Sequence, residues 1–380
     1  MQVDLQAALP RSVDELRNAL TSDTGPILLC GGGTKLAFSN LADGQMSAIS
    51  TAAMNRVLHY EPADLTVAVE AGMTVAELDR VLGDQNQMLP IDCPHPETST
   101  LGGMFASGLG GPRRLKYGSL RDWVLGLEVM GPDGVLTKSG GMVVKNVTGY
   151  DLPRLHFGAH GAFGVVTRLN LKVLPREGAT RSIVATFETA AEAHSAAISV
   201  LVSQMEPVSI IISNAAGWQL SVACAGPQSS IEPLVESIIH IVRATASPTD
   251  VAVSDGKQPA LGSYLQAVES TNSRALARLS IPASQQLAAI EQYAALVGTL
   301  VCADPGSGLV YLSGLPSLEW REAVRRTAQD AVFLALPDDL KTGIDVFGSQ
   351  SPESLGLLKK LKSEFDPDRR LNRERFINGI

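Results

Sequence analysis

The chain has 380 residues and a formal net charge of −8 at pH 7, with 45% hydrophobic and 18% charged residues. This length and apolar content predict two or more packed domains and exclude a largely disordered chain. The acidic balance, without any run of lysine or arginine, excludes the electrostatic footprint of a nucleic-acid or anionic-membrane binder, so small molecules or other proteins are the expected partners.

The N-terminal sequence MQVDLQAALPRSVDEL contains acidic residues and no apolar central stretch, unlike a secretory signal. No apolar run reaches the roughly 18 residues of a membrane-spanning helix. We therefore expect a cytoplasmic location, with attachment to the inner membrane through partner subunits as the alternative. The cysteines are widely spaced, at Cys30, Cys93, Cys224 and Cys302, so we expect neither an iron-sulfur cluster nor another metal site in this chain.

Local patterns in the first third predict alternating helices and strands. Capping-box pairs at residues 12–15 and 74–77 predict two helix starts. Residues 26–30 (PILLC) and 65–71 (LTVAVEA) predict short buried strands between the helices. This alternation indicates a layered arrangement of helices and strands.

The later chain divides at two points. Residues 165–174 alternate with the period of a strand, which we expect Pro175 to end, and glycine becomes scarce beyond it. We expect a first domain at 1–175, a second at 176–336 and a C-terminal segment at 337–380 that returns to the first domain. A helix in this last segment should end near Pro367.

A glycine-rich loop follows the first predicted strand. Gly31, Gly32 and Gly33, with Thr34 and Lys35, permit backbone amide groups to converge on one anion, and a diphosphate is the natural guest. Taken alone, the loop is equally compatible with an ordinary turn that binds no ligand. Its spacing is neither that of a P-loop nor that of a Rossmann dinucleotide fingerprint.

Two further stretches keep small residues where bulk would block a flat ligand. The residues that we expect to bind a cofactor there are Thr100, Leu101, Gly102, Gly103, Ala106, Ser107, Tyr117, Gly118, Gly161, Gly164 and Val165. The sequence KNVTGYDL at 145–152 precedes the last three of them.

In this order, GGGTK, TLGG with its later YG, and KNVTGYDL with GxxGxxGVV resemble the FAD-binding domain of the vanillyl-alcohol oxidase and para-cresol methylhydroxylase type. The resemblance covers roughly residues 25 to 175. It implies an α+β fold with a two-part FAD-binding domain and an α/β cap domain. It further implies that residues 31–35 wrap the FAD diphosphate, that Thr100–Gly103 and Ala106 line the flavin, and that residues 161–165 hold the adenosine half.

Within this superfamily, the Gly-Pro-Arg-Arg element at 111–114 resembles the E subunits of glycolate oxidase complexes. That resemblance implies an FAD-binding oxidoreductase subunit, with a larger FAD-binding paralogue and an iron-sulfur subunit as partners and a small 2-hydroxy acid as substrate. The tail resembles the family ending FDPxGxLNPGRF. It departs from this pattern at Arg369 and Arg370 near the first glycine, and at Arg373 and Glu374 in place of Pro-Gly.

Oxidation of a 2-hydroxy acid requires a base for the hydroxyl proton, and we identify none in the sequence. The paired-histidine metal motif of catalytic relatives has no counterpart among His194 and His240. His156 and His160 are four residues apart, but Pro153 and Gly158 argue against one continuous helix and so against a metal site. We expect non-covalent FAD, because no histidine or cysteine lies between Gly31 and Leu58 to tether it.

Arg113 and Arg114 are candidates for a substrate carboxylate, although contacts with FAD phosphate, a sister subunit or water are equally open. The leading hypothesis is an accessory or electron-relaying FAD subunit of a complex that oxidises glycolate to glyoxylate. One alternative is an independent FAD-dependent D-2-hydroxy-acid dehydrogenase of the D-lactate type. The other is a scaffold subunit without flavin.

Overall fold

The computed structural model describes residues 7–22, 24–42, 44–142, 151–255 and 274–380, which form two compact units. The first unit comprises Met1–Gly110, Ser119–Arg176 and Lys341–Ile380; the second comprises Gly111–Gly118 and Glu177–Leu340. These boundaries lie close to those expected at 175 and 336. The exception is 111–118, which is embedded in the sequence of the first unit yet packs with the second.

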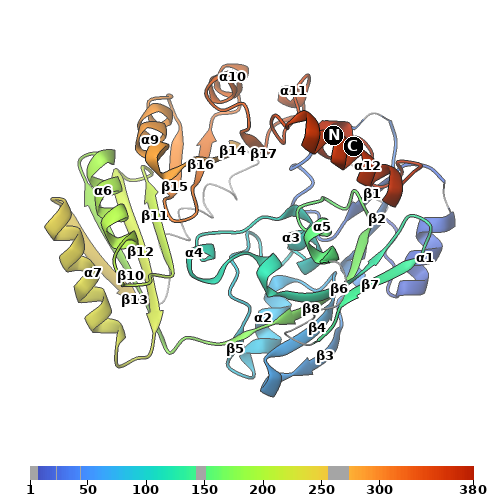
Figure 1. The fold of residues 1–380 in the computed structure, drawn as a ribbon, viewed down its shortest axis with the longest axis horizontal. Coiled ribbons are helices and arrows are strands. Elements are labelled where there is room, and N and C mark those ends of the chain that lie inside the picture. Colours follow the sequence, from blue (N-terminus) through green and yellow to red (C-terminus); the bar gives the residue numbers. More distant parts are fainter. Residues whose placement is uncertain (1–6, 23, 43, 143–150, 256–273) are drawn as a thin grey trace. The chain divides into compact units, whose positions relative to one another are not determined.

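The first unit contains a five-stranded antiparallel sheet and two smaller strand pairs (Figure 1). The sheet has the order β3-β4-β8-β6-β7, built from β3 Val57–Glu61, β4 Thr66–Glu70, β6 Val124–Met130, β7 Leu136–Gly140 and β8 Val165–Lys172. Strands β1 Ile27–Cys30 and β2 Ser47–Ser50 pair in parallel, and β5 Gln87–Met88 pairs with β9 Leu174–Pro175. Strand β8 therefore ends at Lys172, before the expected stop, and Pro175 itself lies within the short strand β9.

Helices begin where the capping patterns predict. The first unit has α1 Val13–Ser22, α2 Val75–Gly83, α3 Leu101–Ser107, α5 Leu152–His156, α12 Pro352–Phe365 and 3-10 turns at Thr51–Ala53, Pro62–Asp64, Leu120–Trp123 and Ile377–Gly379. At the start of α2, the Thr74 hydroxyl accepts a hydrogen bond from the Glu77 amide and the Glu77 carboxylate accepts one from the Thr74 amide. Helix α12 ends just before Pro367, as expected.

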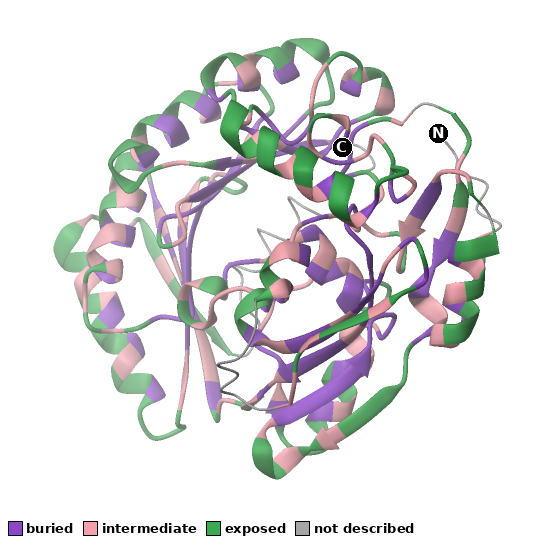
Figure 2. Ribbon diagram, turned by 45° about the vertical axis from the view of Figure 1, so that its right-hand side comes forward, coloured by how far each residue is buried: buried purple, intermediate pink, exposed green. Residues whose placement is uncertain are grey.

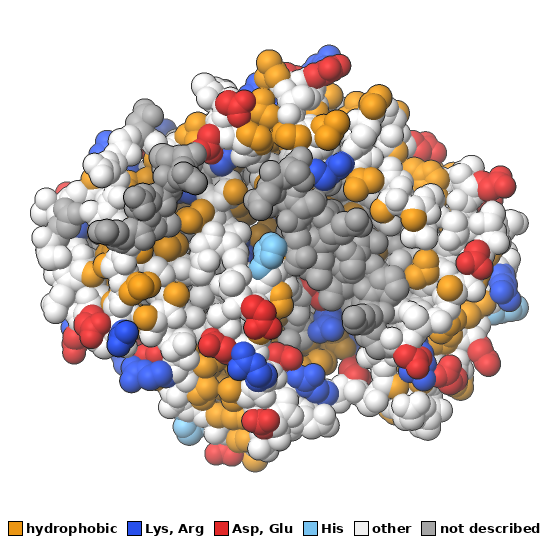
Figure 3. All heavy atoms as spheres, turned by 180° about the vertical axis from the view of Figure 1, so that it is seen from behind, with side chains coloured by type: hydrophobic (Ala, Val, Ile, Leu, Met, Phe, Trp, Pro, Cys, Tyr) orange, Lys and Arg blue, Asp and Glu red, His pale blue; other side chains and the backbone are white. Residues whose placement is uncertain are grey.

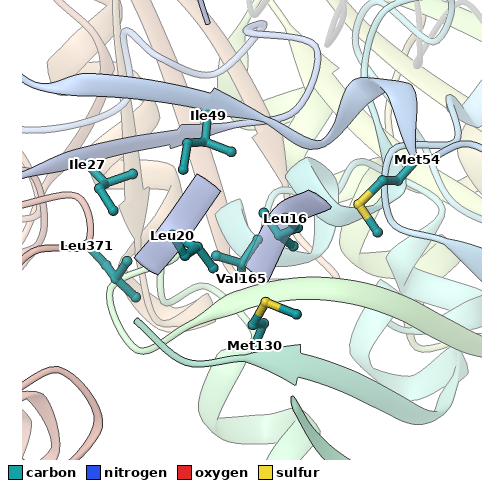
Figure 4. Packing of buried hydrophobic residues seen from close by; sticks show 8 residues of the cluster. All are labelled: Leu16, Leu20, Ile27, Ile49, Met54, Met130, Val165 and Leu371. Atoms are coloured by element: carbon teal, nitrogen blue, oxygen red, sulfur yellow. The ribbon is translucent and has the colours of Figure 1, made fainter. Parts of the chain in front are cut away.

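The core beside α1 joins elements from both ends of the chain (Figure 4). Leu16 and Leu20 of α1 are fully buried against Ile27 of β1 and against Leu371 from the C-terminal tail. The tail also pairs with β1, because the Ile27 amide donates to the Arg370 carbonyl at 2.7 Å and the Asn372 amide donates to the Ile27 carbonyl at 2.8 Å. The last residues of the chain are thereby fixed next to the loop that follows β1.

The second unit is built around an eight-stranded antiparallel sheet with the order β13-β10-β12-β11-β15-β16-β14-β17. Its strands are β10 Ala179–Phe187, β11 Ser209–Ser213, β12 Trp218–Gly226, β13 Asp250–Asp255, β14 Ala275–Ser280, β15 Leu300–Asp304, β16 Leu309–Gly314 and β17 Val332–Ala335. Its helices are α4 Arg114–Tyr117, α6 Ala190–Leu201, α7 Ile231–Thr245, α9 Gln286–Ala294 and α10 Leu318–Thr327, with a 3-10 turn at Ala283–Gln285; α11 Asp338–Lys341 spans the unit boundary.

One connectivity of strands and helices occurs twice in this sheet. The first half runs β10-α6-β11-β12-α7-β13 and the second runs β14-α9-β15-β16-α10-β17, both with the βαββαβ connectivity of ferredoxin-like units. The halves join where β11 pairs with β15, so the strand order of one half mirrors the other. We detect no matching repeat in the amino-acid sequence, because the repetition lies in the connectivity rather than in the residues.

Helices α6, α7 and α9 lie on one face of this sheet (Figure 1), and their sheet-facing sides are buried while their outer sides are exposed (Figure 2). On the molecular face drawn in Figure 3, acidic and basic side chains are interspersed, in keeping with the absence of a charge run in the sequence. In the described parts of the chain, no helix is both long and apolar enough to cross a membrane.

Candidate cofactor site

A pocket in the first unit has an empty volume of about 940 Å³, part of which is open to solvent. Its lining residues are Leu29, Cys30, Gly31, Gly32, Gly33, Thr34, Lys35, Leu36, Phe38, Ser39, Thr51, Thr100, Gly102, Gly103, Ala106, Ser107, His156, His160, Gly161, Gly164, Val165, Val166, Asn372 and Arg375. All three stretches that the sequence singled out therefore contribute to one pocket.

Most of the residues expected to bind a cofactor line this pocket, and Leu101, Tyr117 and Gly118 do not. Leu101 is the first residue of α3 and is fully buried in the core. Tyr117 and Gly118 belong to the second unit. Of the third stretch, 145–150 lies outside the described residues.

The glycines of the first loop are required by close packing against the chain itself. A Cβ on Gly32 would lie 1.7 Å from the Thr98 carbonyl oxygen, and a Cβ on Gly31 would lie 2.0 Å from the Thr100 hydroxyl. This loop is therefore pressed against the backbone that leads into α3. Positive φ contributes only at Gly33, where φ is +76°, so close approach is the reason for glycine at the other two positions.

Helix α3 begins at the pocket wall. The Thr100 hydroxyl accepts a hydrogen bond from the Gly103 amide at 3.1 Å, which fixes the first turn of the helix. A Cβ on Gly102 would lie 2.8 Å from the Ala71 Cβ and 2.9 Å from its carbonyl oxygen. Gly102 thus lets α3 approach the end of β4, and Thr100, Gly102 and Gly103 all face the pocket.

Lys35 is a half-buried cation at the pocket wall with neutral hydrogen-bond partners. Its ammonium donates to the Thr34 and Ser99 hydroxyls, each at 2.8 Å, and the Ser99 hydroxyl donates to the Pro94 carbonyl at 2.6 Å. Burial lowers the pKa of the Lys35 ammonium, and the nearby Cys93 opposes this shift. Hydroxyl partners leave the positive charge uncompensated, which favours an anion in the pocket.

The third stretch closes the pocket from the side of β8. Gly161 has a φ of +72°, which favours glycine. A Cβ on Gly164 would lie 2.4 Å from Cγ1 of Val129. Val165 and Val166 begin β8 and complete this wall.

The C-terminal tail contributes two lining residues that sequence reasoning did not identify as site residues. Asn372 binds both neighbouring segments: its side-chain oxygen accepts from the Leu29 amide at 2.8 Å and its side-chain nitrogen donates to the His160 carbonyl at 2.5 Å. Arg375 donates to the Leu36 carbonyl at 2.7 Å. The sequence signal that could have identified them is the match of Leu371-Asn372 and Arg375-Phe376 to the family ending.

Two residues of the tail that stand where the family ending has glycine adopt positive φ angles. Arg369 and Glu374 stand at the two glycine positions of that ending, and their φ angles are +50° and +63°. Side chains other than glycine adopt this left-handed region at a cost of roughly 1–2 kcal/mol per residue. Surrounding hydrogen bonds, such as those of Asn372, hold the tail in this conformation.

Two histidines also line the pocket, and the sequence indicated them only as a weak metal candidate. His156 ends α5, and burial lowers the pKa of its imidazole to about 4. His160 lies among aromatic rings, with its ring centroid 4.5 Å from that of Phe38 and 5.0 Å from that of Phe347. Over the residues that the structure describes, no group of three or more His, Cys, Asp or Glu side chains is arranged to hold a metal ion.

The segment Gly111–Gly118, which begins with the Gly-Pro-Arg-Arg element, is anchored within the second unit. Lys116 lies 3.2 Å from Glu177, the Tyr117 hydroxyl donates to the same carboxylate at 2.7 Å, and the space beside Gly306 is filled by Leu115. Burial and this hydrogen bond raise the pKa of Tyr117. Arg114 lies near the buried Asp304 and opposes the burial effect that raises the pKa of that carboxyl. Arg113 and Arg114 do not line the pocket.

Comparison with known proteins agrees with this geometry. Residues 5–150 match the family model described as an FAD binding domain. Residues 5–150 are therefore similar to an FAD binding domain. Over 167 residues it is 38% identical to glycolate oxidase subunit GlcE of Escherichia coli K12, a match that covers 44% of this chain and 47% of that protein.

Other relatives are similar over about half of the chain. Glycolate oxidase subunit GlcD of Bacillus subtilis is 30% identical over 53% of this chain and 43% of its own length. A D-lactate dehydrogenase of Archaeoglobus fulgidus is 34% identical over 46% of this chain and 39% of its own length. The matched region thus spans less than half of each of these three relatives.

The fold extends further than the sequence similarity. The solved structure of an alkyldihydroxyacetonephosphate synthase aligns with a TM-score of 0.69 at 19% identity and covers 96% of this chain and 75% of that one. This likeness shows the fold alone.

The pocket has the chemistry that FAD requires. Lys35 and Arg375 supply positive charge, and the lining contains no aspartate or glutamate, which suits a diphosphate. The glycines at 31, 32 and 102 line the pocket, and a Cβ at each would point into the protein and clash with neighbouring residues. The aliphatic residues Leu29, Val165 and Val166 supply apolar wall for the flat rings.

Proposed function

We propose that this chain is an FAD-carrying subunit of a glycolate oxidase-type complex, in which it serves as an accessory or electron-relaying subunit. Bound FAD would supply the electron acceptor. The partners in this proposal are a larger FAD-binding paralogue, which oxidises glycolate to glyoxylate, and an iron-sulfur subunit. The complex would reside in the cytoplasm and contact the inner membrane through its partners.

The similarity to relatives named as glycolate oxidase subunits supports the reaction class. The 38% identity to the GlcE subunit covers 44% of this chain, and the 30% identity to a GlcD subunit supports descent from a common flavoprotein. Small 2-hydroxy acids are accordingly the proposed substrate class of the complex.

The main support for an accessory role is the pKa and charge of the side chains that line the pocket. A general base works best when its pKa lies near the working pH. His156 has a pKa of about 4, burial raises the pKa of the Cys30 thiol, and Lys35 and Arg375 are cations suited to phosphate. The His160 ring packs against Phe38, Phe347 and Phe376. These lining residues favour cofactor binding over abstraction of a hydroxyl proton. Abstraction of that proton by a general base contributes roughly 10² to 10⁴-fold to reaction rates.

The alternative function is an independent D-2-hydroxy-acid dehydrogenase. It is favoured by the 34% identity to a D-lactate dehydrogenase over 46% of this chain. In that case Arg113 and Arg114 would bind the substrate carboxylate, and a base outside the pocket lining would accept the proton.

Flavin reduction under anaerobic conditions separates the two functions. The FAD-loaded isolated chain is mixed with glycolate or D-lactate, and the loss of visible flavin absorption is followed; dithionite is the control for a reducible flavin. We expect no reduction by either hydroxy acid, and reduction once the larger paralogue and glycolate are present. Reduction of the isolated chain at an ordinary enzymatic rate, about 1 to 10³ per second, contradicts the accessory role and supports the dehydrogenase. A folded but colourless chain that takes up no added FAD supports the scaffold alternative.

We further propose that the FAD is not covalently attached. The pocket brings Cys30, His156 and His160 to its wall, so potential tethering residues are closer than the sequence alone indicated. The raised pKa of Cys30 disfavours the thiolate that would attack a flavin. Acid precipitation of the holoprotein should release the yellow colour to the supernatant; flavin fluorescence that stays on the denatured chain contradicts this proposal.

A further inference from the structure

The imidazole of His156 is a buried polar group that faces the FAD pocket without a hydrogen-bond partner among the described residues. His156 is only 5% exposed, and it is one of the pocket-lining residues. Its contact with the described chain is an edge-to-face packing against Phe365, with ring centroids 6.0 Å apart. Its ring nitrogens are thus left for whatever occupies the pocket.

Such an arrangement differs from an ordinary core histidine. Among the described residues, the Nε2 atom of His194 in α6 is buried without a partner and does not line the pocket, whereas His156 keeps a small exposed fraction and lines the pocket. Buried polar side chains in folded proteins almost always find a partner, since an unsatisfied one costs about 1–3 kcal/mol. The remaining exposure of His156 therefore points to a hydrogen bond with a bound ligand.

The position of His156 indicates which half of FAD it meets. Its Cε1 atom lies 3.7 Å from the place that a Cβ on Gly164 would occupy. Gly164 belongs to the stretch 161–165, to which the family resemblance assigns the adenosine half. The adenine edge and ribose hydroxyls of that half offer both donors and acceptors, and a neutral imidazole has one of each.

We propose that the imidazole of His156 forms a direct hydrogen bond to the adenosine half of FAD and so contributes to the choice of FAD over FMN. The burial that lowers the pKa of His156 to about 4 keeps the ring neutral at physiological pH. A phenylalanine at position 156 would occupy the same space as the imidazole and keep the packing against Phe365. Packing and hydrogen bonding can therefore be separated by substitution.

The test uses the apoprotein of the full chain and three probes: FAD, ADP and FMN. Dissociation constants are measured by flavin fluorescence and, for ADP, by calorimetry. His156→Phe should weaken FAD and ADP by roughly threefold to tenfold, the worth of one hydrogen bond, and leave FMN within about twofold. His156→Gln, which retains hydrogen-bonding atoms, should recover part of the loss. His240→Phe, on the exposed side of α7, is the matched control and should change none of the three.

Two results overturn the proposal: unchanged FAD and ADP affinities in His156→Phe, or an FMN loss equal to the FAD loss. Circular dichroism and thermal unfolding of each apoprotein verify that the variants fold. If His156→Phe does not fold, the wild-type chain labelled with ¹⁵N-histidine replaces it. Ring signals of the histidine that stays neutral down to about pH 4 should then move on addition of ADP and not of FMN; no movement with ADP refutes the contact.

Discussion

The Asn372 side-chain oxygen accepts a hydrogen bond from the backbone amide of Leu29 at 2.8 Å, across 343 positions of sequence. The same side chain donates to the His160 carbonyl at 2.5 Å. One residue of the tail thus connects the strand before the glycine loop with the turn before β8. Both segments line the pocket that we propose for FAD, and the tail is therefore part of that pocket.

Asn372→Gly should therefore weaken FAD binding and folding together. Glycine keeps the positive φ of this position, so the variant removes only the side chain. Loss of two hydrogen bonds with their partners left behind should lower the free energy of unfolding by about 1–3 kcal/mol, measured by urea denaturation. Asn378→Gly is the control, because Asn378 also has positive φ but is exposed. Equal effects of both variants would contradict a specific role of Asn372.

Gly32→Ala should already disrupt the site, without a larger side chain. The added Cβ would lie 1.7 Å from the Thr98 carbonyl oxygen, so the loop must move away from its support. We expect FAD affinity to fall roughly tenfold or more, with a stability loss of about 1–3 kcal/mol. Gly102→Val should act likewise through Ala71. Gly110→Ala, where a Cβ meets no atom within 4 Å, is the control, and full flavin occupancy in Gly32→Ala would show that the loop is misassigned.

Stability should fall as the pH is lowered from neutral to about 4, in part because of His156. Burial lowers the pKa of this imidazole from 6.5 to about 4. Between these values the unfolded chain binds one more proton than the folded chain, so acid favours unfolding. Over the whole pH range between these two pKa values, the effect on the free energy of unfolding is about 3 kcal/mol. His156→Phe should remove this part of the pH dependence of unfolding. Parallel curves for the variant and wild type would show that His156 is not the group responsible.

Glycine at the two family positions of the tail should stabilise the protein. Arg369 and Glu374 adopt φ values of +50° and +63°, at a penalty of roughly 1–2 kcal/mol each. This exceeds the extra unfolded-state entropy of glycine, about 0.5–1 kcal/mol. Arg369→Gly and Glu374→Gly should each raise stability by about 0.5–1 kcal/mol in chemical denaturation. Arg373→Gly, at a position without positive φ, should not; a gain there equal to the other two would reject backbone strain as the cause.

Lys362→Met should destabilise the chain strongly, since it breaks a buried ion pair. The Lys362 ammonium lies 2.8 Å from the Asp366 carboxylate, and the two side chains are 2% and 0% exposed. Lys362 also donates to the Ala162 and Leu371 carbonyls, which ties α12 to the tail and to the turn before β8. An uncompensated Asp366 should cost about 3–5 kcal/mol, measured by urea denaturation. The exposed Lys360→Met should be nearly neutral, and a similarly small effect of Lys362→Met would contradict the pairing.

Local sequence patterns by themselves determined much of the site. The Thr74–Glu77 capping pair, the buried strand before Gly31 and the end of α12 near Pro367 depend on interactions a few residues apart, which a sequence displays directly. The ordered series of small residues predicted most of the residues that line the pocket for a similar reason. Glycine is needed wherever backbone meets backbone closely, and its absent side chain is visible in the sequence.

Only the tertiary structure decided which distant segments complete the pocket. Asn372, Arg375 and His156 face it because the tail pairs with β1 and because α5 lies beside Gly164. Likewise, 111–118 packs with the second unit although its neighbours in sequence belong to the first, which removed Tyr117 from the pocket lining. Such contacts arise between segments tens to hundreds of residues apart. They depend on the path of the whole chain, and no spacing of residues within one segment records that path.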